Sequence, residues 1–317
     1  MVKITALFFT LLFMFSLAPQ IYASSLDGAV NNSFRLAQSP KVEPTKPATE
    51  KESSIPEWVK RINFAIEAKS DKKPKYFFET IQPVLGTEED NSILFNQSRI
   101  SIKGERPIYN IGLGLRKILT DRYLVGINTF YDYQELHKHH RGGVGFEAIN
   151  PRGLEARVNT YIRLSKERLV SEDAANQYYE KVANGLDYEL GGPVPNFSFV
   201  KVYAGGYWYD FGHFANEYGW KLRSEFNPVK YSRLNFEVFN DTKRRKTGCS
   251  IEGAITLGFT SFALRDIIKD LTATQEPYPR IDLHKKMLDR VVRDFDITVI
   301  KTTKSKATGF TVEGGRS

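Results

Sequence analysis

The stretch YNIGLGLRKILTDRYLVGINTFYDY, from Tyr109 to Tyr133, holds two amphipathic β-strand patterns separated by a short polar turn. A period of two residues places alternate side chains on opposite faces of a strand. One face of the second strand carries Tyr123, Val125, Ile127, Thr129, Tyr131 and Tyr133. This face is apolar with aromatic ends, whereas the opposite face is mostly glycine and polar. The stretch therefore predicts the wall of a membrane β-barrel, with its apolar face in lipid and its polar face inside.

Strand-like segments continue on both sides of this stretch, and each is near the ~10 residues that a tilted strand needs to cross a bilayer. Twelve are predicted, near residues 59–68, 76–85, 92–103, 108–118, 122–134, 141–149, 153–164, 183–190, 197–210, 217–227, 232–241 and 248–259. The sequence thus predicts an all-β protein, a twelve-stranded antiparallel transmembrane barrel.

The connections between these segments alternate in kind. One set is short and turn-like, at 86–91, 119–121, 150–153, 191–196 and 227–231. The other set is mostly longer and charged, beginning at Gln134, Ser165, Phe211 and Asp241, and its longest member covers 165–184. In an up-and-down barrel the two sets lie on opposite sides of the membrane, as periplasmic turns and extracellular loops do.

The N-terminal region is expected to be a targeting segment followed by a leader. Residues 1–23 have one lysine, an apolar run and small residues near Ala23, which predicts a secretory signal peptide. Residues 24–56 are rich in Ser, Pro, Lys, Thr and Glu, which predicts a disordered periplasmic leader. The barrel is expected over residues 57–260.

Composition excludes several classes of protein. The formal net charge is +8, but the basic residues are spread through loops and one strand face, which favours anionic lipid headgroups over nucleic acid. Cys249 is the single cysteine, so no intramolecular disulfide can form. Its apolar neighbours indicate a passive side chain.

After the last predicted strand the pattern changes to helical spacing. Two charged amphipathic segments are predicted, Ser261 to Leu271 and Ile281 to Arg293, followed by a β-prone tail at 301–317 that is rich in Lys and Thr. A surface amphipathic helix is one interpretation of the second segment.

The whole pattern resembles the β-domain of the intimin and invasin family, the inverse autotransporters. The resemblance rests on motifs that follow in order: NIGLGLR at 110–116, VGINTFYDY at 125–133, RGGVGFEA at 141–148, ARVNTYIRLS at 156–165, NGLDYELGG from 184, SEFNP from 224 and MLDRVVRDFDI from 287. It implies that residues 261–300 include a helical or extended linker that threads back through the pore. The chain departs from the family in having no peptidoglycan-binding module in its leader and only 17 residues after Ile300, so a vestigial or absent passenger is expected.

On this reading the lumen and the linker supply the residues of interest. Those expected to face the lumen are Arg116, Asn128, Asp132, Glu147, Glu155, Arg157, Asn159, Lys221, Arg223, Glu225 and Glu237. Those expected in the pore linker are Met287, Leu288, Arg290, Val291 and Arg293. The four lumen glutamates are expected to face Lys285, Lys286, Arg290 and Arg293 across a wet gap, with each pair contributing little and the set fixing a register.

Catalysis and metal binding are not predicted. Strand glutamates can serve glycoside hydrolysis as carboxylate pairs, but Arg157, Lys221 and Arg223 occupy neighbouring inward positions, and charge compensation in a wet lumen is the simpler interpretation. The histidines His137, His139 and His140 could bind a metal, but they lie in a Lys-rich loop and are expected to have no carboxylate or thiol partners. We therefore expect no enzyme activity, no cofactor and no metal.

The sequence therefore predicts an outer-membrane translocator and anchor of the inverse autotransporter type, with a link to cell adhesion through any displayed passenger. The alternative is a simple outer-membrane channel whose C-terminal segment is a plug or a periplasmic tail. An extracellular all-β enzyme or lectin fits less well, because the sheets of a sandwich need apolar faces buried against each other. Expected partners are outer-membrane lipid and lipopolysaccharide, the outer-membrane assembly machinery, and a host or neighbouring-cell surface.

Overall fold

The computed structural model describes residues 56–257 and 280–316, apart from 71, 105, 121, 230, 231, 309 and 310. The predicted signal peptide, the leader up to residue 55 and the predicted helix at 261–271 lie outside the described residues. Among the residues that are described, no helix is long and apolar enough to cross a membrane.

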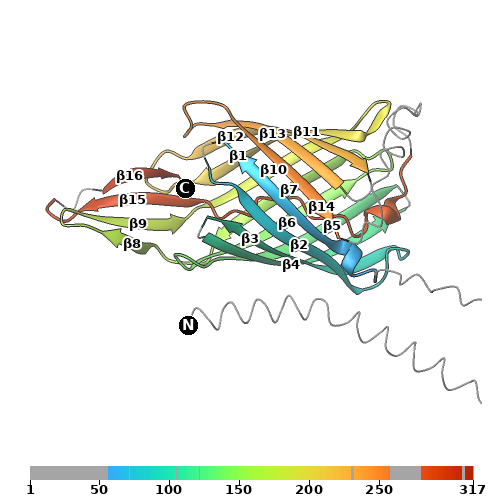
Figure 1. Cartoon of the computed structure of the whole chain (residues 1–317), viewed down its shortest axis with the longest axis horizontal. Helices are drawn as coiled ribbons and strands as arrows, with labels where there is room; N and C mark the ends of the chain where they lie inside the picture. The colour runs from blue at the N-terminus through green and yellow to red at the C-terminus, as the bar shows by residue number, and fades with distance from the viewer. Residues whose placement is uncertain are drawn as a thin grey trace, which may run out of the picture.

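In the described part of the chain, twelve antiparallel strands close into one barrel (Figure 1). They are β1 (Ile62–Lys69), β2 (Lys75–Leu85), β3 (Ser92–Lys103), β4 (Arg106–Leu119), β5 (Tyr123–Gln134), β6 (His139–Ile149), β7 (Glu155–Arg163), β10 (Asn184–Val194), β11 (Phe197–Asp210), β12 (Glu217–Val229), β13 (Ser232–Asp241) and β14 (Gly248–Thr256). The predicted twelve-stranded barrel is confirmed.

Each barrel strand pairs with the next barrel strand along the chain, and β7 pairs with β10 because β8 and β9 belong to another sheet. The barrel closes where β1 pairs with β14, from Asn63 opposite Thr256 to Lys69 opposite Ser250. The connections therefore fall into two groups at opposite ends. We call one end the turn end, with connections at 86–91, 120–122, 150–154, 195–196 and 230–231. We call the other the loop end, with connections at 70–74, 104–105, 135–138, 164–183, 211–216 and 242–247.

Several boundaries differ from the predicted ones. The first predicted strand begins with a 3-10 turn, η1 (Val59–Arg61), before β1. The turn predicted at 191–196 is mostly strand, because β10 continues to Val194 and only Pro195 and Asn196 join it to β11. Asn196 has a φ of 65°, a left-handed conformation that asparagine tolerates and that such a tight hairpin requires.

A second sheet stands on the loop end, and we call it the rim sheet. The segment 165–184, expected to be a loop, forms β8 (Arg168–Glu172) and β9 (Asn176–Val182). The C-terminal residues form β15 (Val299–Ser305) and β16 (Thr311–Arg316), and the four strands pair in the order β16-β15-β9-β8. Figure 1 shows this sheet projecting beyond the barrel strands. The sequence predicted a β-prone tail where β15 and β16 form, but β8 and β9 lack the amphipathic pattern of the barrel strands and were not predicted.

The outer face of the barrel is apolar, as the alternation predicts. Leu113, Ile127 and Val158 are 48%, 45% and 38% exposed, whereas the residue after Ile127, Asn128, is buried. On the inner face, a Cβ at Gly112 or Gly114 would lie 2.4 Å and 2.3 Å from the rings of Phe130 and Phe95. These two glycines make room for aromatic rings inside the barrel.

The assignment of faces predicts the effect of a charge on the outer wall. Ile127→Lys is expected to impair barrel assembly, because a lysine near the bilayer midplane costs ~2–4 kcal/mol. The measurement is the fraction of heat-modifiable, folded barrel in outer-membrane preparations. The matched control is Ser250→Lys, whose side chain would enter a cavity lined also by Glu237 and Glu252. Equal assembly of the two variants would show that the faces are assigned wrongly.

Candidate functional site

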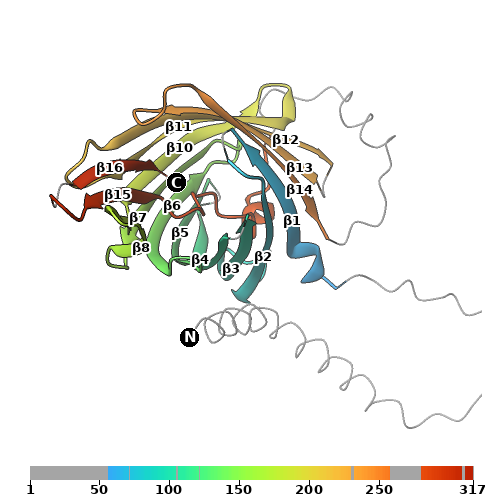
Figure 2. The ribbon, with the colours of Figure 1, turned by 60° about the vertical axis from the view of Figure 1, so that its left-hand side comes forward.

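Residues 280–298 cross the interior of the barrel from one end to the other, and we call them the linker. At the turn end, the amide of Ile281 donates to the carbonyl of Pro151, 2.7 Å away. At the loop end, the linker continues into β15, where Val299 pairs with Val182 of β9. Figure 2 looks into the ring of strands and shows the linker inside it.

The linker is not the helix that its spacing predicts. Only a 3-10 turn, η2 (Leu283–Lys286), is present, capped by the Asp282 side chain, which accepts from the amide of His284. The rest is extended and irregular, and from Val291 to Ile297 buried and partly exposed residues alternate. The helix prediction for 281–293 is therefore wrong.

Side chains of the barrel supply the hydrogen bonds that a helix would have made within itself. The Arg116 guanidinium donates to the carbonyls of Lys286, Met287 and Asp289, at 3.3, 3.0 and 2.5 Å. A buried backbone N–H or C=O group without a hydrogen-bond partner would cost free energy. An extended chain inside a barrel therefore needs polar side chains of the wall at the same positions along the barrel axis as its own backbone groups.

Further along the linker, amide side chains of the barrel, rather than Arg116, form hydrogen bonds with the linker backbone. The Val291 amide donates to Gln97 Oε1 at 2.8 Å, and Gln97 Nε2 donates to the Val291 carbonyl at 3.4 Å. Asn159 Nδ2 donates to the carbonyl of Val292 at 3.1 Å. Such paired contacts fix the register of the linker against the strands.

The most buried charges join the linker to β5 and β6. Both terminal nitrogens of Arg293 donate to the carboxylate of Asp132, at 2.9 and 2.8 Å. Arg141 Nε donates to the same carboxylate at 2.8 Å. The two terminal nitrogens of Arg141 donate to the carbonyls of Asp296 and Asp294. All three ionic side chains are almost completely buried, and we call them the Asp132 cluster.

An apolar cluster lies beside these polar contacts. Its buried members are Ile81, Ile93, Phe95, Ile118, Leu124, Phe130, Ile149, Leu283, Met287, Val291 and Phe295, with Leu288 packed against them. Seven members come from the inner face of the barrel and four from the linker. The inner face was expected to be glycine and polar, and this patch was missed because its apolar side chains are partnered by a segment far along the chain.

The predicted lumen residues lie on the inner face, but the acidic ones mainly pair with cations of the barrel itself. Glu147 pairs with Arg116 at 2.6 Å, and Glu155 pairs with Arg157 and with Lys201. Further pairs join Arg157 and Arg223 to Glu189, Arg223 to Glu225, and Lys221 to Asp187. Glu237 lines a cavity, and Asn128 contacts the strand position of Gly145.

The lumen glutamates line the same cavities as linker cations, but the direct ion pairs of those cations are with other carboxylates. Glu147, Glu155 and Glu225 line one cavity together with Lys286 and Arg290, and Glu237 lines the other together with Arg290 and Arg293. Arg290 lies 3.5 Å from Glu252, and Arg293 binds Asp132, neither of which is among the four predicted glutamates. Lys286 pairs with Asp289 of the linker itself. The reason is that cations of the inner wall itself, such as Arg116, Arg157 and Arg223, already pair with the glutamates.

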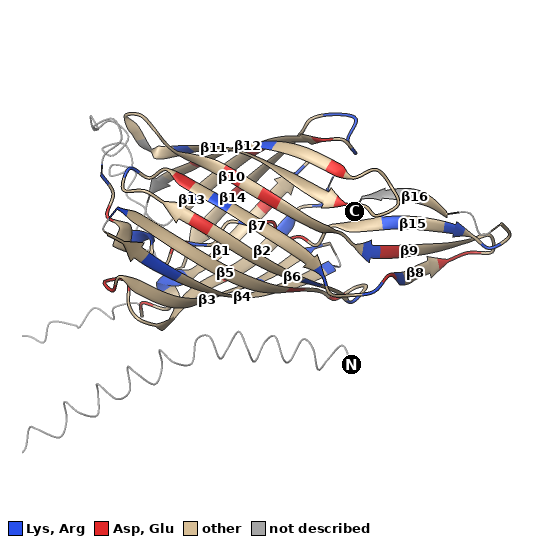
Figure 3. Cartoon of the chain, turned by 180° about the vertical axis from the view of Figure 1, so that it is seen from behind, with Lys and Arg blue, Asp and Glu red and all other residues tan. Residues whose placement is uncertain are grey.

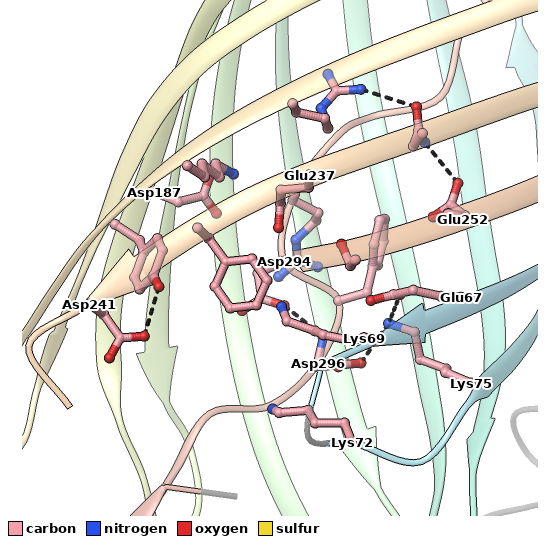
Figure 4. A pocket seen from close by; sticks show the side chains of 18 of the residues that line it. Glu67, Lys69, Lys72, Lys75, Asp187, Glu237, Asp241, Glu252, Asp294 and Asp296 are labelled. Carbon is pink, nitrogen blue, oxygen red and sulfur yellow. Dashed lines mark hydrogen bonds and ion pairs between the residues drawn. The ribbon is translucent and has the colours of Figure 1, made fainter. Parts of the chain in front are cut away.

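Two cavities flank the linker inside the barrel. One, of about 590 Å³, lies toward the loop end and is lined by Lys69, Lys72 and Lys75 among others. In Figure 4 the Lys75 ammonium points toward Glu67 and Asp296, from which it lies 2.5 and 3.1 Å. The other, of about 540 Å³, lies toward the turn end, and Arg290 and Val292 line both cavities. The linker thus stands between them.

The sequence analysis did not single out several of the residues that hold the linker. These are Gln97, Asn110, Arg141 and Lys75, which contact Val291, Phe295, Asp296 and Asp294. Polar side chains at inward positions of β2, β3, β4 and β6 were the available signal. For β2 and β3 the alternation is poor, so those inward positions were not assigned.

Known proteins are similar to this chain in sequence. The model of the family described as "Inverse autotransporter, beta-domain" matches residues 38–248. The chain is 34% identical over 119 residues to an attaching and effacing protein homolog of Escherichia coli (strain K12), a match that covers 37% of this chain and 38% of the relative. It is 34% identical over 108 residues to the inverse autotransporter adhesin YeeJ of the same organism, covering 34% of this chain and 4% of the relative. The matches thus span well under half the length of these curated relatives.

The fold also has a solved counterpart. The chain superposes with a TM-score of 0.59 on a structure described as "Unveiling the Mechanism Behind the in-meso Crystallization of Membrane Proteins". The superposition covers 75% of this chain and 98% of that one, at 17% identity. At this identity the likeness establishes the barrel fold alone.

Proposed function

The chain belongs to the inverse autotransporter β-domain family, and on that basis we propose that it anchors in the outer membrane and passes its own C-terminal segment to the cell surface. The observation that carries this proposal is the continuous path of the linker from the turn end to the loop end, followed by pairing of β15 with β9. In this orientation the turn end faces the periplasm, and the displayed segment includes at least β15 and β16.

The surroundings of the barrel follow from its walls. An outer-membrane barrel with an apolar belt contacts lipid and lipopolysaccharide. We further propose signal-peptide-dependent export, insertion by the outer-membrane assembly machinery, and contact with a host or neighbouring-cell surface through whatever is displayed. The adhesin name belongs to the relative, and adhesion by this chain depends on the displayed segment.

We propose no catalytic role for the lumen. Glu155, Glu189 and Glu225 each form an ion pair with an arginine or lysine of the inner wall of the barrel. Carboxylates held in this way serve charge compensation, whereas a general acid needs a carboxyl group that stays protonated near neutral pH.

A plain channel is the second candidate. The two cavities favour it, because they leave space for water on both sides of the linker and are lined by polar side chains. Against it stand the contacts of Arg116, Gln97 and Arg141 with linker carbonyls, which hold the linker at a defined register. The two functions differ in where the C-terminal residues lie.

Trypsin treatment of intact cells is expected to test the orientation. Lys166 is exposed at the loop end, and Arg152 is exposed in a turn at the turn end, so the two sites form a matched pair. We expect cleavage after Lys166 on intact cells and cleavage after Arg152 only once the outer membrane is permeabilised. The measurement is mass spectrometry of the fragments. Cleavage at Arg152 with Lys166 protected on intact cells would invert the topology and refute display of the C-terminal segment.

A further inference from the structure

Three side chains with metal-binding atoms meet where the rim sheet joins the barrel. They are His137 in the β5–β6 connection, His139 at the start of β6, and Glu180 in β9. His137 Nδ1 lies 2.6 Å, and His139 Nε2 lies 3.0 Å, from the same oxygen, Oε2 of Glu180. One ligand atom from each residue lies within 4.8 Å of the others.

The fold, and not the local sequence, assembles this cluster. Lys138, between the two histidines, has a φ of 54°, a left-handed conformation that turns the chain from the connection into β6. The two imidazole rings then lie 6.0 Å apart and nearly perpendicular. Glu180 supplies the carboxylate from a strand 41 residues further on. Glu135, which is nearer in the sequence, accepts from the hydroxyl of Tyr109.

The donor set suits a borderline divalent transition-metal ion. Two imidazole nitrogens and one carboxylate oxygen are a common protein set for Zn²⁺, which takes ligands at ~2.0–2.2 Å in a tetrahedron. Ligand atoms in such a tetrahedron stand ~3.4 Å apart. The two contacts of Glu180 Oε2, at 2.6 and 3.0 Å, would therefore open by less than ~1 Å.

Burial and charge at the cluster are compatible with an ion. His139 is fully buried, and the partly exposed His137 leaves a side open to solvent from which a water can complete the coordination. The Glu180 side chain is buried, and its Oε2 faces the two imidazoles. Lys301 Nζ lies 4.0 Å from the other oxygen, Oε1, and its side chain is exposed enough to turn into solvent.

We propose that His137, His139 and Glu180 form a binding site for a divalent transition-metal ion of the Zn²⁺ type, with water as the fourth ligand. The ion would fasten β9 to the rim of the barrel. Because β9 is also the strand that pairs with β15, the site would stiffen the surface on which the C-terminal segment is held. Figure 3 shows charged residues of both signs on β9 and only basic ones on β15. The metal site itself does not depend on the proposed export function.

The test is isothermal titration calorimetry of Zn²⁺ binding to the folded protein in detergent micelles. The protein is prepared without a polyhistidine tag, because such a tag would itself bind Zn²⁺. We expect one ion per chain, and for His139→Gln and Glu180→Gln at least a ~100-fold loss of affinity, since loss of a mere outer-shell partner costs metal sites ~10- to 100-fold. His140→Ala is the matched control, because His140 neighbours the cluster but contacts Tyr131 instead, and it should keep the affinity of the unmodified chain.

A second readout separates binding at this cluster from binding elsewhere. Zn²⁺ should slow tryptic cleavage after Lys166, at the base of the β8–β9 hairpin, in the unmodified chain and in His140→Ala, but not in Glu180→Gln. Heat-modifiable mobility in gels confirms that each variant has folded. Absence of Zn²⁺ binding to the folded chain would overturn the proposal and leave the cluster as hydrogen bonds between two imidazoles and a carboxylate. Equal affinity in Glu180→Gln would overturn it as well.

Discussion

Deletion of residues 281–317 is expected to open the barrel and raise its single-channel conductance severalfold. The linker occupies the interior between the two cavities, and Arg290 and Val292 border both of them. Without these residues the cavities merge, and water fills the lumen around the ionic side chains. The measurement is conductance in planar bilayers with purified, folded protein. In parallel, an epitope fused after Ser317 of the intact chain should be stained on unpermeabilised cells.

A shorter deletion provides the matched control. Removal of residues 306–317 takes away β16 but leaves the linker and β15, which lie within and at the rim of the barrel. Its conductance should equal that of the intact chain. If the long deletion left the conductance unchanged and the epitope required permeabilisation for staining, the threaded arrangement would be refuted and a plain barrel would remain.

Asp132→Ala is expected to destabilise the folded barrel by ~3–5 kcal/mol, the usual cost of removing one partner from a buried ion pair. The substitution leaves two buried guanidinium groups, Arg141 and Arg293, without their shared carboxylate. The measurement is the midpoint of denaturant unfolding in micelles. Adding Arg293→Met should recover part of the loss, because it removes one of the two uncompensated charges and keeps apolar contact with Phe130.

Glu88→Ala is the control for this prediction. Glu88 pairs with Arg61 at 3.2 Å, but it is largely exposed, and such surface pairs contribute only ~0–1 kcal/mol. The Glu88→Ala midpoint should lie close to that of the unmodified chain. If the Asp132→Ala midpoint lay equally close to it, the Asp132 cluster would not hold the linker.

The barrel could be predicted because its alternation is local. Leu113 and Ile127 reach lipid while Arg116 and Asn128 point inward, and a period of two records this within a dozen residues. Inward aromatic residues such as Phe95 and Phe130 break the apolar-out, polar-in rule. Their reason is the linker, which lies more than 150 residues away in the sequence, so no local pattern could reveal it.

Apolar residues four apart predict a helix at 281–293, whereas the family resemblance implies a linker that is either helical or extended. Leu283, Met287, Val291 and Phe295 all pack in the same cluster. A spacing of four is close to one helical turn, but it is also two repeats of an extended chain, which places the same residues on one face. Only the surroundings decide between the two, and the side chains of Arg116 and Gln97 favour the extended form by satisfying its carbonyls.

The His137, His139 and Glu180 cluster illustrates the same limit. The two histidines are visible in the sequence as a pair separated by one residue, but their carboxylate partner belongs to a hairpin whose strands were not predicted. A short strand is recognisable only when its pairing partner is known. For β9 that partner is β15, 117 residues further along the chain from Val182 to Val299.

If the C-terminal segment leaves through the pore as proposed, the pairing of β15 with β9 affects the direction in which it moves. Seven residues of β15, from Val299 to Ser305, form a ladder with β9 directly beyond the exit. Each residue that emerges and pairs must be released again before the chain can slide backwards, and a ladder opens cooperatively, so retreat requires many hydrogen bonds to break together. Pairing in the rim sheet would then oppose backward diffusion of the chain, so the free energy of strand pairing would bias movement toward the exit without ATP.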